Sequence, residues 1–228
     1  MMMRFERIYT RKYRKILAKY AFKSAKAYET GSRRDVEIAL TGFRMELKPI
    51  LYKNITQAYV AFGKKAIEDF ESERKADEFQ RYVQNYFRDF GLEKVNQIDD
   101  TTKDDIFEII SQGEMDGEPT SVISKRIFDL GKGIARHRAS TIAITETHSA
   151  ASYGSQQAAK STGLVLKKEW VSASDSRTRS SHDSADGQKV DMDQKFKVNG
   201  SELMYPGDPS GPASETIRCR CVELYHEI

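Results

Sequence analysis

Apolar residues recur at helical spacing through most of the first 160 residues of this chain. Residues 4–28 contain neither glycine nor proline, and Tyr9, Tyr13 and Tyr20 return to one face of a helical projection. This spacing predicts an amphipathic helix. We expect the helix to end at Gly31, because glycine readily adopts the backbone angles that terminate helices.

The helical pattern continues in segments that are bounded by glycine, proline or a capping threonine. We expect these further helices at residues 34–47, 50–70, 76–90, 103–112, 120–130 and 134–161. Breaks are predicted at Pro49, Gly91 and Gly131, and Thr101 or Thr102 is the predicted N-cap of the helix at 103–112.

After residue 163 the pattern changes to short runs typical of strands. The predicted strands lie at residues 164–171, 195–198, 201–205 and 219–225. Asn199-Gly200 favours a two-residue hairpin turn, because both residues tolerate positive φ. The sequence therefore predicts an α+β fold: a long helical N-terminal region, then a compact C-terminal unit with a helix packed on a small antiparallel β-sheet.

A cluster of Gly113, Gly117 and Pro119 predicts a boundary between a helical arm or bundle at 1–118 and a second domain at 119–228. The 228 residues suffice for one large domain or two small ones. No stretch approaches about 18 uncharged apolar residues, so we expect no membrane partner. The N-terminus has charge but no apolar segment of a secretory signal, which favours a product made in the cytoplasm.

Charge is distributed unevenly along the chain. Residues 1–53 carry 14 Lys and Arg against 5 Asp and Glu, whereas residues 68–118 carry 6 against 16. This asymmetry suits an anionic partner at one end and a basic partner at the other, although solvated helix faces would explain it equally well. The aromatic residues among the N-terminal charges are Tyr9, Tyr13, Tyr20 and Phe22. They could stack on nucleic acid or pack on a neighbouring helix.

Two cysteines and a histidine are candidate metal ligands. Cys219 and Cys221 are too close in sequence for an unstrained disulfide, and a reduced compartment suits them better. With His182 they could supply three soft ligands for a tetrahedral metal such as zinc. The candidates for a fourth ligand are Asp175, Asp186, His148 and water. Alternatively, both cysteines are small residues that pack within a strand.

Acid and base candidates are Glu146, Asp175 and His182, which could form a hydrolytic centre. With Arg177 and Arg179 nearby, the same groups could form a structural ion-pair network, and we favour this second interpretation. The chain contains no nucleophile elbow, phosphate loop or metalloprotease helix. The single tryptophan, Trp170, is expected to anchor the core of the C-terminal unit.

The order and spacing of six motifs resemble the phage Mu F-like minor head proteins, also called the phage head morphogenesis domain. The motifs are TIAITET (141–147), the strand around Trp170, DSRTRSSH (175–182), Asp186-Gly187, YPGD (205–208) and CRC (219–221). The resemblance covers about residues 120–228 and implies that the structural motif residues are Glu146, Trp170, Asp175, Arg177, Gly187, Pro206, Gly207 and Asp208. Arg218 departs from it, since the family usually carries Asn there. Relatives often carry Cys in the places of Arg179 and His182, an exchange that a zinc site would tolerate.

The resemblance implies a non-enzymatic minor capsid component of a tailed bacteriophage. Such proteins associate with the portal protein and stay inside the DNA-filled head of the virion, where some affect DNA packaging or ejection. Further partners implied are the major capsid or scaffolding protein and the packaged double-stranded DNA. The alternative is a metal-dependent nuclease or other hydrolase acting on nucleic acid. A free DNA-binding regulator is disfavoured, because no helix-turn-helix signature is present.

Overall fold

The computed structural model describes residues 1–69 and 76–228, with side chains at all of these except 66–69, 76–80 and 134. Its contacts divide the chain into a helical unit, Met3–Lys53 and Arg88–Ala143, and a C-terminal unit, Met1–Met2, Asn54–Phe87 and Ile144–Ile228. Each unit takes residues from both sides of the predicted boundary at residue 118. The domain boundary at residue 118 therefore stays a prediction from the sequence.

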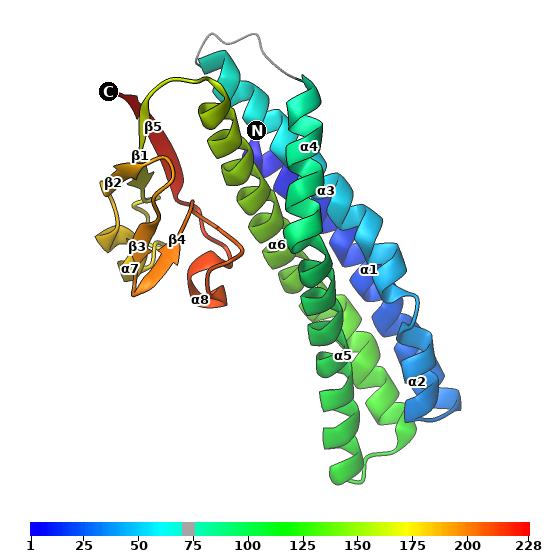
Figure 1. The fold of residues 1–228 in the computed structure, drawn as a ribbon. Coiled ribbons are helices and arrows are strands. Elements are labelled where there is room, and N and C mark those ends of the chain that lie inside the picture. Colours follow the sequence, from blue (N-terminus) through cyan, green and yellow to red (C-terminus); the bar gives the residue numbers. More distant parts are fainter. Residues whose placement is uncertain (70–75) are drawn as a thin grey trace. The chain divides into compact units, whose positions relative to one another are not determined.

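The described part of the first 161 residues is helical almost throughout, as the apolar spacing predicts (Figure 1). The helices are α1 (Met2–Thr30), α2 (Arg33–Leu40), α3 (Phe43–Asp69), α4 (Ala76–Tyr86), the π-helix η1 (Phe87–Gly91), α5 (Leu92–Met115) and α6 (Thr120–Ser161). Helix α1 buries Tyr9, Tyr13 and Tyr20. These rings are therefore core residues and offer no stacking surface to nucleic acid. Phe22 is 55% exposed, and its ring lies 5.4 Å from that of Phe128.

Helix α3 continues through Pro49, where the sequence predicts a break. Proline inside a helix removes a hydrogen bond and costs about 3 kcal/mol. Pro49 is exposed, while Leu47 and Leu51 on either side of it are fully buried. Burying two leucines contributes roughly 3–6 kcal/mol, which is enough to offset the proline.

Helices α4 and α5 are joined through η1, so the predicted helix end at Gly91 is wrong. The predicted helix at 103–112 is part of the longer α5. Thr101 and Thr102, the predicted caps, lie inside this helix, and their hydroxyls donate to backbone carbonyls one turn earlier, at 2.7 and 2.6 Å. This local hydrogen bond lets a threonine hydroxyl be satisfied within a helix.

Helix α6 runs through Gly131, so the two helices predicted at 120–130 and 134–161 are one. A Cβ atom at Gly131 would lie 2.9 Å from the Cβ of Ala21 in α1. The glycine therefore permits a close approach of two helices in the helical unit, and it does not end either of them.

Part of the charge asymmetry is resolved inside the helical unit. Arg44 from the basic segment donates to Asp99 and, at 2.9 Å, to Asp100 of the acidic segment. Arg33 lies 3.4 Å from Glu114. Opposite charges of the two segments thus pair with each other within one unit.

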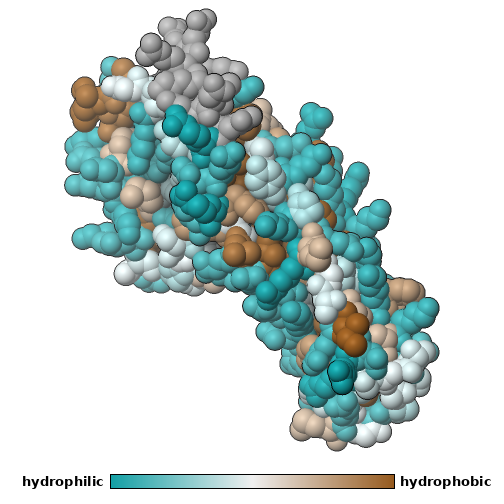
Figure 2. Space-filling view, turned by 45° about the vertical axis from the view of Figure 1, so that its right-hand side comes forward, coloured by the Kyte–Doolittle hydropathy of each residue, from teal (hydrophilic) through white to brown (hydrophobic). Residues whose placement is uncertain are grey.

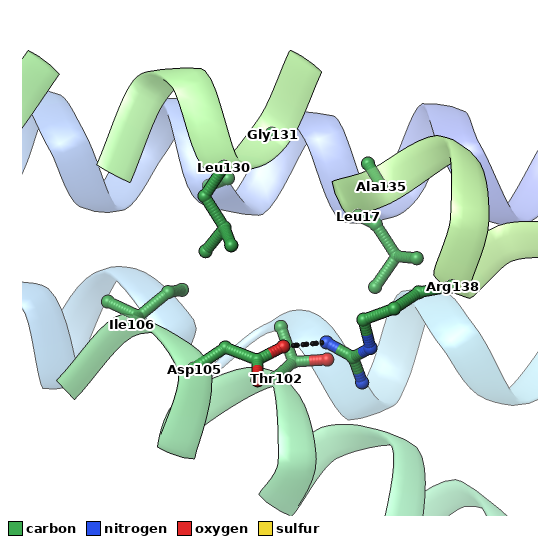
Figure 3. A pocket seen from close by; sticks show the side chains of 9 residues that line it. Leu17, Thr102, Asp105, Ile106, Leu130, Gly131, Ala135 and Arg138 are labelled. Carbon is green, nitrogen blue, oxygen red and sulfur yellow. Dashed lines mark hydrogen bonds and ion pairs between the residues drawn. The ribbon is translucent and has the colours of Figure 1, made fainter. Parts of the chain in front are cut away.

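A further ion pair of the helical unit lies beside a cavity of about 20 Å³ (Figure 3). Arg138 Nη1 donates to Asp105 Oδ2 at 2.7 Å, among the side chains of Leu17, Ile106 and Leu130. Burial raises the pKa of Asp105 and lowers the pKa of Arg138, and the attraction between the two charges opposes both shifts. Each charge therefore depends on the other.

The C-terminal unit contains two small antiparallel sheets. Strand β1 (Leu166–Val171) lies between β2 (Lys189–Asp191) and β5 (Val222–Glu227) and is antiparallel to both. The remaining elements are α7 (Ser180–Ser184), the hairpin of β3 (Phe196–Val198) and β4 (Ser201–Leu203), and α8 (Ala213–Thr216). Gln156 of α6 donates to Glu223 of β5 at 3.0 Å, so the helix packs beside the sheet (Figure 1). The predicted α+β fold is confirmed.

The predicted hairpin turn is also confirmed, because Asn199 and Gly200 have φ of 52° and 74°. Trp170 is fully buried, and its ring meets that of Phe196 edge-on at 5.4 Å. The buried cluster around it consists of Trp170, Ala185, Phe196, Val198, Leu203, Cys219 and Cys221. Trp170 is thus the anchor of this core.

The molecular surface is largely hydrophilic on the face shown in Figure 2. On the described part of this face, hydrophobic residues form separate patches instead of one continuous surface. Among the described residues, none of the helices combines the length and apolar character that crossing a bilayer requires.

Candidate metal centre

Three potential metal ligands meet in the core of the C-terminal unit. His182 Nδ1 lies 3.3 Å from Cys221 Sγ and 3.7 Å from Cys219 Sγ. The three ligand atoms all lie within 4.8 Å of one another, and no side chain of the three is more than 2% exposed. The fold therefore brings together the residues that the sequence predicts as ligands.

Short elements on either side of the β3–β4 hairpin hold these ligands. His182 lies in α7, while both cysteines lie between α8 and β5. The predicted strand start at Cys219 is wrong, because β5 begins at Val222. The backbone turns at Arg218, just before the cysteines: its φ is 57°, and its backbone N–H donates to Thr145 Oγ1 at 3.0 Å. Asparagine adopts this left-handed conformation more readily than arginine does. This preference explains why the family that the motifs resemble usually carries Asn at the position of Arg218.

Glu215 of α8 orients the histidine. Its Oε2 lies 3.1 Å from His182 Nε2 and accepts a 2.9 Å hydrogen bond from the Ser181 hydroxyl, while its Oε1 accepts one from Asn199 Nδ2 at 3.2 Å. Burial alone would raise the pKa of Glu215, but these hydrogen bonds lower it below its usual value. The ionised carboxylate accepts the Nε2–H of His182, which leaves the Nδ1 lone pair facing the two sulfur atoms.

The two thiols differ in acidity because they share one hydrogen bond. Donation from the Cys219 thiol lowers the pKa of Cys221 to about 5 against the effect of burial. The same contact, together with burial, raises the pKa of Cys219. Thiolate character is therefore concentrated on the sulfur nearer to the imidazole.

Cys221, His182 and Glu215 stand in the order of a nucleophile, a base and an orienting carboxylate. A nucleophile must be reached by its substrate, and Cys221, His182 and Glu215 are only 2%, 1% and 3% exposed. A buried pair of sulfurs with one imidazole nitrogen is instead the donor set that zinc prefers. The geometry therefore favours metal binding over catalysis.

The three protein candidates for a fourth ligand lie outside the cluster. Asp175 is exposed and accepts hydrogen bonds from the backbone and side chain of Arg177, at 2.9 and 2.5 Å. Asp186 accepts the backbone N–H of Ser172 at 2.6 Å. His148 Nε2 lies 2.8 Å from the carbonyl oxygen of Cys221. Among the described residues, the potential metal-binding group contains His182 and the two cysteines alone.

The YPGD motif forms a buried turn against α6. Asp208 Oδ2 accepts the N–H of Met204 at 2.7 Å, and Oδ1 accepts that of Ser210 at 2.9 Å. Gly207 has φ of 81°, and a Cβ atom there would lie 2.8 Å from His148 Nδ1. Pro206, Gly207 and Asp208 are all buried. His148 thus packs on this turn with one side and supports the cysteine segment with the other.

A hydrolytic centre would need the candidate acid and base residues Glu146, Asp175 and His182 to contact one another. In the described part of the chain, His182 hydrogen-bonds Glu215 and not Glu146 or Asp175. Glu146 is buried in α6, 6% exposed. The Asp186-Gly187 motif serves the backbone: Gly187, at φ 75°, donates its N–H to the carbonyl of Trp170 at 2.8 Å.

Two buried charged residues were not identified by sequence reasoning. Glu215 has no spacing signal that relates it to His182, because a tertiary contact brings them together. Lys168 lies on β1 and is fully buried, with Nζ donating to the Met204 carbonyl at 2.6 Å. Burial lowers the pKa of Lys168 to about 8 and raises that of the neighbouring Glu223 to about 7. The alternation of β1 could have indicated Lys168, since it shares a face with Leu166 and Trp170.

Comparison with known proteins places these motifs in a family. Residues 104–224 match the family described as Phage Mu protein F like protein. The chain is 32% identical over 156 residues to minor head protein GP7 of Bacillus phage SPP1, covering 66% of this chain and 49% of GP7. It is 25% identical over 142 residues to YqbB of Bacillus subtilis, covering 60% of this chain and 46% of YqbB.

A shorter likeness links the chain to an enzyme. It is 36% identical over 78 residues to NAD(+)–arginine ADP-ribosyltransferase EFV of Enterococcus faecalis, covering 34% of this chain and 16% of that protein. The chain thus spans about half the length of GP7 and YqbB and a sixth of EFV. No solved structure matches the chain. Because the family match covers more than half of the chain, this protein belongs to the phage Mu protein F like family.

Proposed function

We propose that this phage head protein is an internal component of the virion that associates with the portal and contributes to head assembly, DNA packaging or DNA delivery. The observation that carries the proposal is the likeness to a minor head protein over 66% of this chain, alongside the family match. Because the chain spans 49% of GP7, the role of GP7 as a minor head protein is proposed for this chain.

The use of the motif residues supports a structural, non-enzymatic role. Asp208 and Gly187 hold backbone turns through hydrogen bonds. The Asp175 carboxylate binds both the side chain and the backbone N–H of Arg177. His182 is buried against Glu215. Groups engaged in this way stabilise a fold. The enzyme EFV shares 16% of its length with this chain, so we assign no transferase activity here.

A basic stripe on α1 is the surface that we propose for contact with packaged DNA. The basic stripe consists of the exposed residues Arg4, Arg7, Arg11, Arg14 and Lys15. Their spacing of three or four residues places them on one helix face, and a rise of 1.5 Å per residue extends the stripe over about 16 Å. Arginine and lysine along such a line neutralise phosphates without reading sequence.

The portal contact is tested by co-expressing this chain with the portal protein of the same phage. The portal is captured by an affinity tag, and the complex is sized by light scattering. We expect a portal oligomer that carries a small number of copies of this chain. The major capsid protein, captured in parallel, controls for adhesion to any phage protein. Separate elution of the chain and portal at micromolar concentration would contradict the association.

The DNA contact is tested by measuring affinity for random double-stranded DNA at several salt concentrations. Five cations predict a slope of log affinity against log salt no steeper than about −4.5. Changing Arg7→Glu and Arg11→Glu should weaken binding by about tenfold or more. The matched control is Lys64→Glu with Lys65→Glu, exposed positions on α3. Equal loss in both variants would exclude the basic stripe. Cleavage of the DNA with added magnesium or zinc would support the hydrolase alternative.

A further inference from the structure

We propose that His182, Cys219 and Cys221 bind one zinc ion, with a water molecule as the fourth ligand, and that this ion holds the C-terminal unit in its fold. The ligand set is on different segments: α7 contributes the histidine, and the segment between α8 and β5 contributes the cysteines. The proposal is independent of the role in the phage head, because it rests on side chains within one unit.

The two nitrogen–sulfur distances match a tetrahedral zinc site. With Zn–S bonds of about 2.3 Å and a Zn–N bond of about 2.0 Å, tetrahedral angles place nitrogen and sulfur about 3.5 Å apart. The two observed nitrogen–sulfur distances are 3.3 and 3.7 Å. Both nitrogen–sulfur distances therefore lie within about 0.2 Å of the tetrahedral value, which is the tolerance expected of a metal site.

The chemistry of the donors selects the class of metal. Thiolate sulfur and imidazole nitrogen suit zinc and other borderline or soft ions, whereas magnesium and calcium require oxygen ligands. The hydrogen bond between His182 Nε2 and Glu215 is the carboxylate–histidine arrangement that fixes the ring and tautomer of a metal ligand. Glu215 is a positioning residue in this site.

A bound ion also explains why polar side chains occupy this core. The cysteines belong to the same buried cluster as Trp170 and Phe196, and the His182 ring meets the Trp170 ring edge-on at 5.4 Å. Burying polar groups without strong partners is unfavourable. A metal would satisfy all three groups at once and would connect segments more than 35 residues apart in sequence.

The direct test uses the full chain, purified under reducing conditions after growth with zinc. Elemental analysis by mass spectrometry should find one zinc per chain. Replacing zinc by Co²⁺ should give thiolate-to-cobalt charge-transfer absorption with the strong visible bands of a tetrahedral site. Titrating the unmodified protein with p-hydroxymercuribenzoate should release one zinc for every two thiols modified. This last measurement requires no variant, so it remains informative if the variants fail to fold.

Variants separate the ligands from neighbouring groups. Cys219→Ser and Cys221→Ser should each lose the bound zinc, whereas His226→Ala should keep it, because His226 contacts Glu169 on the sheet and is 41% exposed. His182→Cys preserves a zinc-binding atom and should retain both the metal and the cobalt absorption. Retention of zinc by both serine variants would exclude these cysteines as ligands.

The positioning role of Glu215 has its own readout. Glu215→Gln should weaken zinc binding by roughly 10–100-fold, measured by competition with a chromophoric chelator. Glu202→Gln makes the same change at an exposed position on β4 and should leave the affinity unchanged. The zinc proposal is overturned if the zinc-grown protein contains no stoichiometric zinc, shows no cobalt absorption, and has thiols that react independently of added metal or form a Cys219–Cys221 disulfide.

Discussion

The helical unit and the second half of the C-terminal unit build their cores from different materials. The helical unit buries apolar side chains that recur along long helices, such as Val36, Leu40 and Leu47. Around Trp170, short strands and turns bury His182 and Lys168 among the apolar residues. Small sheets have little apolar surface to bury, so specific polar contacts must supply part of the stability. A change of equal size should therefore act differently in the two regions.

Removal of the proposed metal should produce the largest difference between the two regions. A site saturated a thousandfold above its dissociation constant stabilises the fold by about 4 kcal/mol, and chelation removes this contribution. Because Trp170 is the only tryptophan and lies against His182, its fluorescence reports on this region. We expect EDTA to change the fluorescence while most helical circular dichroism persists. Unchanged fluorescence and unfolding midpoint after chelation would contradict the prediction.

A mutation that creates a cavity in the helical unit should instead lower the stability of the helices and leave the zinc content unchanged. Leu47→Ala removes a fully buried side chain and should destabilise by about 3 kcal/mol, within the usual range for such changes. Urea unfolding followed by circular dichroism measures the loss, and zinc content should stay constant. Met45→Ala, on the same helix at an 80% exposed position, should change stability by less than about 0.5 kcal/mol. Equal effects would show that Leu47 is not a core residue.

The YPGD turn offers a smaller, sharper test of the C-terminal unit. Gly207→Ala places a Cβ atom 2.8 Å from His148 Nδ1 at φ of 81°, so backbone strain and a clash should together cost about 2–3 kcal/mol. Gly163→Ala has a similar φ, 75°, but open space around it, and should cost only the strain of about 1 kcal/mol. Thermal unfolding of both variants gives the comparison. Identical losses would mean that the close approach to His148 is unimportant.

The Arg138–Asp105 pair of the helical unit should give the smallest effect. Arg138→Met removes one partner of a pair whose side chains are 18% and 29% exposed, which should destabilise by about 1–2 kcal/mol. The control is Arg136→Met, an exposed position on the same helix. A double-mutant cycle with Asp105→Asn isolates the pair energy from the packing of the side chains. A coupling energy near zero would assign the pair no structural role.

Sequence patterns predicted the helices well and their interruptions poorly. Apolar spacing is a property of the segment itself, so α1 was found almost to its ends. Pro49, Gly91 and Gly131 are local signals for a break, and at Pro49 and Gly131 tertiary packing overrides the signal. At Pro49 the buried neighbours Leu47 and Leu51 decide the outcome. Such packing involves distant parts of the chain and has no local signature.

The candidate metal centre shows the same limit. Residue type was enough to select His182, Cys219 and Cys221, because few side chains bind soft metals. It was not enough to find Glu215, a common residue type that becomes significant only where the fold places it 3.1 Å from His182. Of the candidates for a fourth ligand, the sequence could not show that Asp175 binds Arg177 within its own turn, that Asp186 accepts the N–H of Ser172, or that His148 contacts the carbonyl of Cys221, which leaves water.

Counting this chain in particles tests the proposed internal role in the phage head. Quantitative mass spectrometry of purified DNA-filled heads and empty proheads would measure its copies relative to the portal protein. Protease treatment of intact particles beforehand would remove any externally attached copies. The proposed function predicts a few protease-resistant copies per portal ring in both kinds of particle. Absence of the chain from both would contradict the proposed function.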